Sequence, residues 1–160
     1  MGNLVYAETT IFSFYHDERP APAVVAMRQW TRQWWNEHRH RFDIVTSAAV
    51  LAELDRGNLP HRDRALAMAA ELPAIPVEPD ISEIVDVYIQ RRVMPADPVG
   101  DALHLAIASV HKADYLVTWN CRHLANANKF DHIRRVNAIL GLQTPDLVTP
   151  LELIGEVQMP

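Results

Sequence analysis

The stretch "LVYAETTIF", Leu4 to Phe12, places a single carboxylate where a buried strand ends. The residues before the acid are apolar without alternation, which is typical of a parallel strand covered on both faces. Glu8 follows this strand directly, and the two hydroxyl residues Thr9 and Thr10 come next. The sequence around Glu8 therefore combines a core strand with polar groups that the core does not need.

The rest of the chain alternates between predicted strands and helices. Further strands are predicted at 42–46, within 73–79, at 114–119 and around 147–148. Helices are predicted at 22–38, 48–56, 61–71, 80–92, 98–112 with Asp97 as N-cap, a short segment from 121, and 130–141. Such alternation predicts an α/β fold with a central parallel sheet between two layers of helices. Ligands of these sheets bind beyond the carboxyl ends of the strands, so Glu8 is expected to belong to a site.

Composition places the chain among ordinary globular proteins. It has 160 residues, with 49% hydrophobic and 22% charged residues and a single cysteine. One domain over 1–160 is expected, and the lone cysteine fits a reducing cytoplasm. We expect no signal peptide and no membrane span. The net charge of -5 excludes a global basic field for nucleic acids, so any binding of RNA needs a local patch.

Three further polar residues stand in apolar surroundings. Asp101 opens the apolar segment "DALHLAIASV", where it could also simply favour the helix dipole. Glu53 lies in "SAAVLAELDRG", where a surface glutamate is the alternative, and Asn120 follows "YLVTW", where it could be an N-cap. Together with Glu8, these oxygen ligands suit a hard cation such as Mg²⁺ or Mn²⁺. Such an ion would relieve the repulsion between the carboxylates.

Two segments are similar to a known family. "VYAETTIFSF" and "DALHLAIASVHKADYLVTWNCRHLAN" resemble PIN-domain ribonucleases, in particular the VapC-like toxins of type II toxin–antitoxin systems. The resemblance spans roughly residues 3–155 and implies a three-layer α/β/α domain with a metal-dependent ribonuclease site. It implies catalytic roles for Glu8, Glu53, Asp101 and Asn120, and a supporting hydroxyl from Thr9 or Thr118. It also implies RNA as substrate, a cognate antitoxin and a homodimer as partners, and a cytoplasmic protein.

The sequence departs from the family pattern at two of these positions. Glu8 replaces the usual aspartate and is longer by one methylene, while Asn120 stands where many members have an aspartate and removes one negative charge. Mg²⁺ or Mn²⁺ is expected on Glu8, Asp101 and Asn120, with Glu53 helping to hold metal or water. A second ion should bind more weakly, so activity is expected to need a high ion concentration or bound substrate.

Other residues allow two interpretations. Arg122 and His123 either approach a phosphate at the edge of the site or form a solvated short helix. Trp30 and Trp34 fit the core of a long amphipathic helix, although aromatic residues beside arginines can also stack on RNA bases. His104 is interpreted as a hydrogen-bonded core histidine.

Two other function classes remain open. A catalytically weak or inactive PIN-fold module would use the same surface to bind RNA or protein. A phosphohydrolase of the aspartyl-phosphate type is disfavoured, because "AETT" lacks the expected Asp-x-Asp after the first strand.

Overall fold

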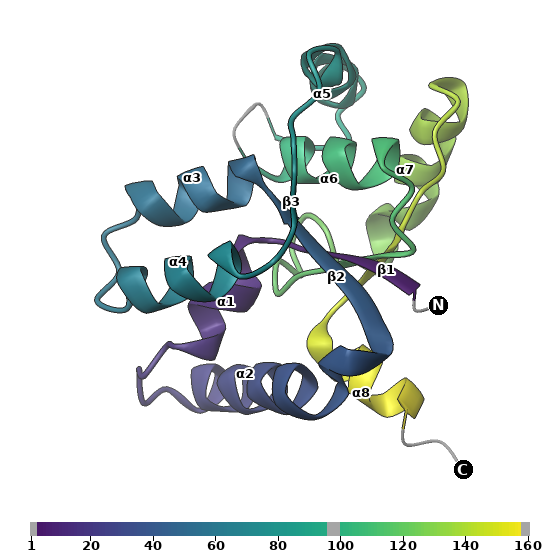
Figure 1. Ribbon diagram of the computed structural model, residues 1–160. Helices are drawn as coiled ribbons and strands as arrows, with labels where there is room; N and C mark the ends of the chain where they lie inside the picture. The colour runs from purple at the N-terminus through teal and green to yellow at the C-terminus, as the bar shows by residue number, and fades with distance from the viewer. Residues whose placement is uncertain (1–2, 96–99, 158–160) are drawn as a thin grey trace.

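The computed structural model describes residues 3–95 and 100–157, with side chains described up to 154. Its strands are β1 Asn3–Ala7, β2 Phe42–Ser47, β3 Ala74–Ile75, β4 Tyr115–Val117 and β5 Asp146–Val148. All paired strands are parallel, in the order β3-β2-β1-β4-β5 (Figure 1). The predicted central parallel sheet is confirmed.

The strand order places the end of β1 at the switch point of the sheet. Val5 pairs with Ile44 of β2 on one side and with Tyr115 of β4 on the other. The chain leaves β1 toward β2 and β3, and only later crosses to β4 and β5 on the opposite side. Crossovers that diverge in this way open a crevice beyond the carboxyl ends of the two central strands. Glu8 follows β1 at this point, and its backbone N–H donates to Val117 O of β4 at 3.3 Å.

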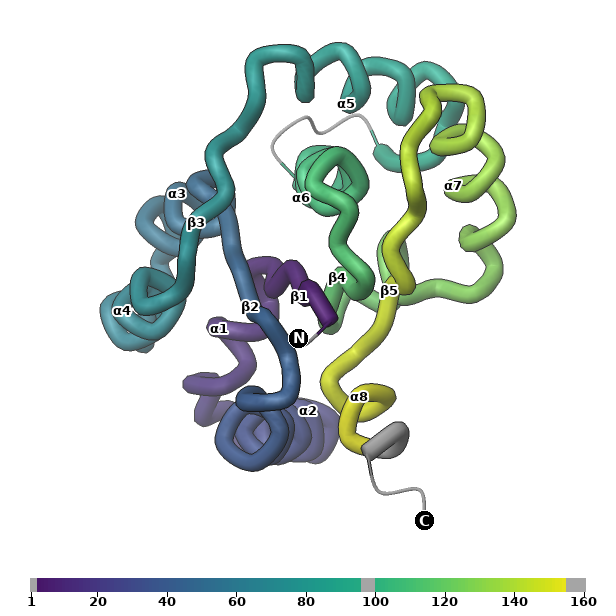
Figure 2. Tube along the Cα trace, turned by 45° about the vertical axis from the view of Figure 1, so that its right-hand side comes forward, coloured from purple at the N-terminus to yellow at the C-terminus, as the bar shows by residue number. Residues whose placement is uncertain are grey.

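Helices cover both faces of the sheet. They are α1 Thr9–Tyr15, α2 Pro22–Gln33, α3 Ala48–Arg56, α4 Arg62–Ala70, α5 Ile81–Gln90, α6 Asp101–Val110, α7 Ala127–Ile139 and α8 Pro150–Val157. α5, α6 and α7 lie on one face, and α1, α2 and α8 lie on the other, while α3 and α4 lie beside the β3–β2 edge (Figures 1 and 2). This is the expected three-layer α/β/α arrangement. No helix in the described ranges is long and apolar enough to cross a membrane.

The hydrophobic core lies between the sheet and both helical layers. Its largest fully buried side chains include Trp34, Tyr6, Tyr88 and Phe12. α6 contributes an almost entirely apolar helix, which explains why so little of it reaches the solvent. Trp34 is fully buried, as predicted, whereas Trp30 is only partly buried.

Besides shifts of a few residues at element ends, the element predictions differ from the structure in four places. α1 was not predicted. The helix predicted at 22–38 is α2 followed by a π-helical turn, Trp34–His38, so the winding changes before its end. The short helix predicted from 121 is wrong, because 121–124 form only turns closed by the backbone of Asn120. α8 was not predicted. The predicted N-cap Asp97 lies outside the described residues.

Candidate active site

Glu8 is buried at the carboxyl end of β1, where it caps α1. Its side chain is only 3% exposed. Oε1 accepts hydrogen bonds from Thr10 N at 2.8 Å, from the Thr10 hydroxyl, and from Thr118 Oγ1 at 2.9 Å. Burial raises the pKa of Glu8, and neither the charge of His104 nor these hydrogen bonds fully offsets that effect. The protein therefore holds a carboxylate in a place that disfavours its charge.

Thr10 and Thr118 join the ends of β1 and β4. Thr118 Oγ1 donates to Glu8 and accepts from Asn120 N at 2.9 Å. Thr10 Oγ1 accepts from Trp119 N at 2.8 Å. Because both hydroxyls are held from two sides, the orientation of Glu8 is fixed by two strands that are distant in sequence. The hydroxyl of Thr118, a predicted supporting residue, contacts Glu8, whereas Thr10 was not identified from the sequence.

Glu53 reaches the same place from α3. Its Oε2 accepts from Thr9 Oγ1 at 2.9 Å, and its Oε1 lies 2.6 Å from His104 Nε2. Burial alone would raise the pKa of Glu53, but the hydrogen bond and charge of His104 outweigh it, so the pKa is lowered. The surface position considered for Glu53 is wrong, because its side chain is 23% exposed and bonded to two neighbours.

His104 is the buried centre of this region. Its side chain is 1% exposed, and its Nδ1 lies 2.7 Å from Tyr6 Oη. Burial lowers the pKa of His104, but the carboxylates of Glu53, Glu8 and Asp101 raise it more, and the net direction is upward. The prediction of a hydrogen-bonded core histidine is confirmed. Its partner, however, is a candidate catalytic carboxylate, which the sequence did not reveal.

We call the hydrogen-bonded side chains around Glu8 and Glu53 the carboxylate network. Its members are Glu8, Thr9, Thr10, Glu53, His104 and Thr118. Four acid or amide residues were predicted for the site, and two of them, Glu8 and Glu53, are brought together here. Thr9, which follows Glu8 directly in the chain, donates a hydrogen bond to Glu53. The other two predicted residues, Asp101 and Asn120, lie at the border of the network.

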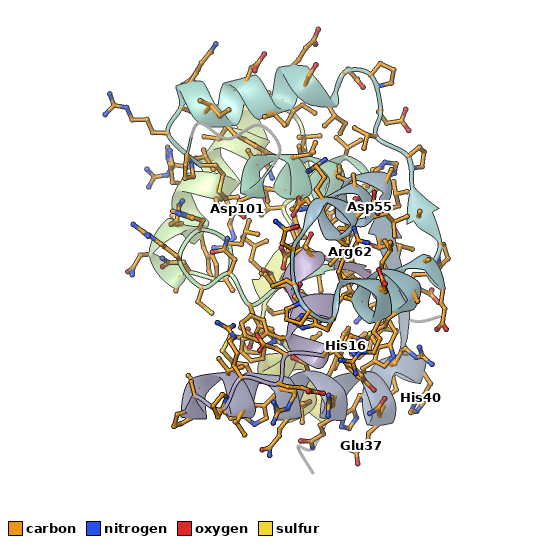
Figure 3. The ribbon with its side chains drawn as sticks, turned by 90° about the vertical axis from the view of Figure 1, so that its left-hand side faces the viewer. His16, Glu37, His40, Asp55, Arg62 and Asp101 are labelled. Atoms are coloured by element: carbon orange, nitrogen blue, oxygen red, sulfur yellow. The ribbon has the colours of Figure 1, made fainter. Side chains whose placement is uncertain are left out.

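Asp101 is the first residue of α6 and is half-buried. It lies on the face that Figure 3 views, where the carboxyl ends of the strands are found. Its charge raises the pKa of His104 and opposes the lowering of the pKa of Lys129 by burial, so it lies within electrostatic reach of the network.

Asn120 is linked to Glu8 through Thr118, and it closes the turn that follows β4. Its Oδ1 accepts from Arg122 N at 3.2 Å and from His123 N at 3.0 Å. Asn120 therefore closes a turn and does not cap a helix as predicted, and a metal would have to share this oxygen. At the rim of the candidate site, Arg122 is exposed and His123 is half-buried. Trp119, in the segment that follows β4, stacks on Trp30 with ring centroids 6.1 Å apart.

The donor set suits a hard divalent ion, but a complete cage is not preformed. In the described ranges, no group of three or more His, Cys, Asp or Glu side chains is close enough to hold a metal ion. The hydrogen bonds to Glu8 from these residues all go to Oε1, which leaves Oε2 as the oxygen suited to a ligand. Mg²⁺ commonly takes only one or two carboxylates and fills its other positions with water and substrate phosphates. A site with few protein carboxylates is compatible with that mode of binding.

Comparisons with known proteins identify the fold of the chain. No protein-family model and no curated protein matches the chain. Among solved structures, this chain is similar to a protein chain in the crystal structure of VapBC2 from Rickettsia felis, which is bound to a DNA fragment from the VapBC2 promoter. The TM-score is 0.51 at 15% identity, over 91% of this chain and 96% of that chain. The likeness concerns the fold, and the chain has a VapC-like PIN fold.

Proposed function

We propose that this chain is a Mg²⁺- or Mn²⁺-dependent endoribonuclease that hydrolyses phosphodiester bonds in RNA. The observation that carries the proposal is the meeting of Glu8 and Glu53 through Thr9, at the switch point of a parallel sheet. A site at this place, built of carboxylates and hydroxyls, suits a hard ion and a phosphate ligand. The VapC-like PIN fold supports the same conclusion.

Glu8 and Asp101 would hold the ion, with Asn120 as a further oxygen ligand. Such an ion polarises the phosphodiester and lowers the pKa of bound water. Because no complete cage is preformed in the described part of the chain, binding of the ion should be weak until RNA phosphates join it. This agrees with the expectation, drawn from the reduced charge at Asn120, that activity needs a high ion concentration or bound substrate.

Glu53 would orient the attacking water as a hydrogen-bond acceptor and would not serve as the base that removes the proton of that water. A carboxylate whose pKa is lowered is a weak base but a permanent hydrogen-bond acceptor at neutral pH. Thr9 and His104 hold its two oxygens, so its direction is fixed before substrate arrives. Arg122 and His123 at the rim would contact the phosphates on either side of the cut.

We further propose that the chain is the toxin of a toxin–antitoxin pair. The solved relative is a VapBC2 complex on promoter DNA, which suggests a cognate antitoxin as partner for this chain. A homodimer and a cytoplasmic location belong to the same proposal. An antitoxin would be recognised by its covering of the carboxylate network and its suppression of RNA cleavage.

A second candidate is an inactive PIN-fold module that binds RNA or protein. It is favoured by the incomplete metal cage in the described part of the chain and by the hydrogen bonds that Asn120 Oδ1 accepts within its own turn. It predicts binding of RNA without cleavage at any concentration of Mg²⁺ or Mn²⁺.

The test uses purified protein and a single-stranded RNA labelled with a fluorophore and a quencher. Cleavage is expected with Mn²⁺, is expected to stop with a chelator, and should be lost in Asp101→Asn. Asp63→Asn is the matched control, because Asp63 lies on α4 with its side chain 88% exposed. RNA binding without cleavage in the wild type would favour the inactive module.

A further inference from the structure

We propose that His104 is a positioning residue that fixes Glu53 through a buried hydrogen-bonded relay, which we define as Ser47, Tyr6 and His104. This inference rests on the proposed function, and it assigns a role to a residue outside the predicted metal ligands. The relay runs from Ser47 Oγ to Tyr6 Oη at 2.7 Å, from Tyr6 Oη to His104 Nδ1 at 2.7 Å, and from His104 Nε2 to Glu53 Oε1 at 2.6 Å.

One arrangement of protons lets each member of the relay donate once. Val50 N donates to Ser47 Oγ at 3.3 Å, and in this arrangement the Ser47 hydroxyl donates to Tyr6. With a neutral imidazole, the Tyr6 hydroxyl then donates to Nδ1, and the proton on Nε2 donates to Glu53. With a doubly protonated imidazole, Nε2–H still donates to Glu53, while Nδ1–H donates to Tyr6 Oη. The contact to Glu53 is therefore the same in both forms.

Glu53 needs two anchors because its side chain has several rotatable bonds. Thr9 holds Oε2 at 2.9 Å and His104 holds Oε1, so both carboxylate oxygens have fixed partners. Thr9 follows Glu8 directly, which ties the position of Glu53 to that of the other carboxylate. An orienting group must be held closely in this way, since small displacements in a site cost large factors in rate.

A purely structural role does not explain a histidine at this position. The neighbouring residues of α6, Ala102, Leu105 and Ala106, are buried and apolar, so an aliphatic side chain would fit the layer. A buried polar group is costly unless its hydrogen bonds are made. Here they are made, and they lead from the interior to a carboxylate that remains 23% exposed at the site.

The test compares His104→Leu with His104→Gln in the RNA cleavage assay. Leucine removes both ring nitrogens, and kcat is expected to fall by about 10–100-fold with little change in KM, as for other residues that orient a ligand. Glutamine offers an N–H near the position of Nε2, and it should recover most of the rate. In the Glu53→Gln background, His104→Leu should have no further effect, because the residue acts through Glu53. Equal losses in both backgrounds would overturn the proposal.

A spectroscopic measurement separates this proposal from the proposed function. In protein labelled with ¹⁵N-histidine, the ring signal that disappears in His104→Gln identifies His104. Its shifts should change in Glu53→Gln and in Tyr6→Phe. They should not change in Tyr88→Phe, the matched control, whose buried hydroxyl bonds Asn137 instead. If the wild type cuts no RNA, the proposed function fails, whereas a His104 signal unaffected by Glu53→Gln would refute the relay itself.

Discussion

Glu8→Gln is expected to make the metal-free protein more stable at neutral pH and to remove its stabilisation by divalent ions. The hydrogen bonds to Glu8 from the described residues converge on Oε1, and an amide oxygen with its two lone pairs can accept two of the three. The substitution therefore removes the charge and its desolvation cost while it retains most of the local hydrogen bonding. Functional residues that are held at a cost to stability commonly behave in this way.

The sign and the pH dependence of this effect follow from the raised pKa of Glu8. A carboxyl whose pKa is higher in the folded state favours folding at low pH, and that contribution is lost as pH rises through the folded value. The variant and the wild type should therefore have similar stability near the ordinary pKa of 4.5 and diverge above it. We expect a gain of about 1–2 kcal/mol at pH 7.5, or about 2–8 °C in Tm for a chain of this size.

The assay is thermal unfolding in chelator from pH 4.5 to 8, followed by titration with Mn²⁺ at pH 7.5. Mn²⁺ should raise the Tm of the wild type and leave that of Glu8→Gln unchanged. Glu71→Gln, at an exposed position after α4, is the control and should follow the wild type throughout. A variant that melts below the wild type at pH 7.5 would show that the charge of Glu8 stabilises the fold, and the reasoning would be wrong.

Three further predictions concern the border of the site, the pH range and the core. Asn120→Asp should keep the turn after β4, since aspartate accepts the same N–H groups, and should lower the Mn²⁺ concentration at half-maximal cleavage; an unchanged metal titration would remove Asn120 from the ligand set. In chelator, the stability that Glu53→Gln removes should be largest in the middle of the pH range. It should shrink as pH falls through the lowered pKa of Glu53 and as pH rises through the raised pKa of His104, which a series of melting curves from pH 3 to 9 will check. Trp34→Ala should destabilise the protein by about 3–5 kcal/mol in denaturant titrations, because the side chain is fully buried; a loss below 1 kcal/mol would contradict that packing.

The sheet and the place of the site could be predicted because their signals are local. The apolar run before Glu8 and the strand before Asn120 each carry their pattern within a few residues. The parallel arrangement then follows from the alternation with helices, and it brings the strand ends to one edge.

The contacts inside the site could not be predicted in the same way. The bond between His104 and Glu53 joins residues 51 positions apart, and that between Thr118 and Glu8 joins residues 110 apart. Neither partner has a sequence pattern that points to the other. Thr10 was missed because the helix that presents its hydroxyl, α1, was itself not predicted, and α8 was not predicted either.

The central position of β1 has a consequence for synthesis of the chain. β1 is made first, yet its neighbour β4 and the donor Thr118 follow 110 residues after Glu8. At about 5–20 residues per second, a ribosome needs roughly 5–20 s to supply them. During that time Glu8 lacks one of its donors and the crevice between β1 and β4 does not exist. A nascent chain of this protein therefore cannot assemble its site before Thr118 has been translated.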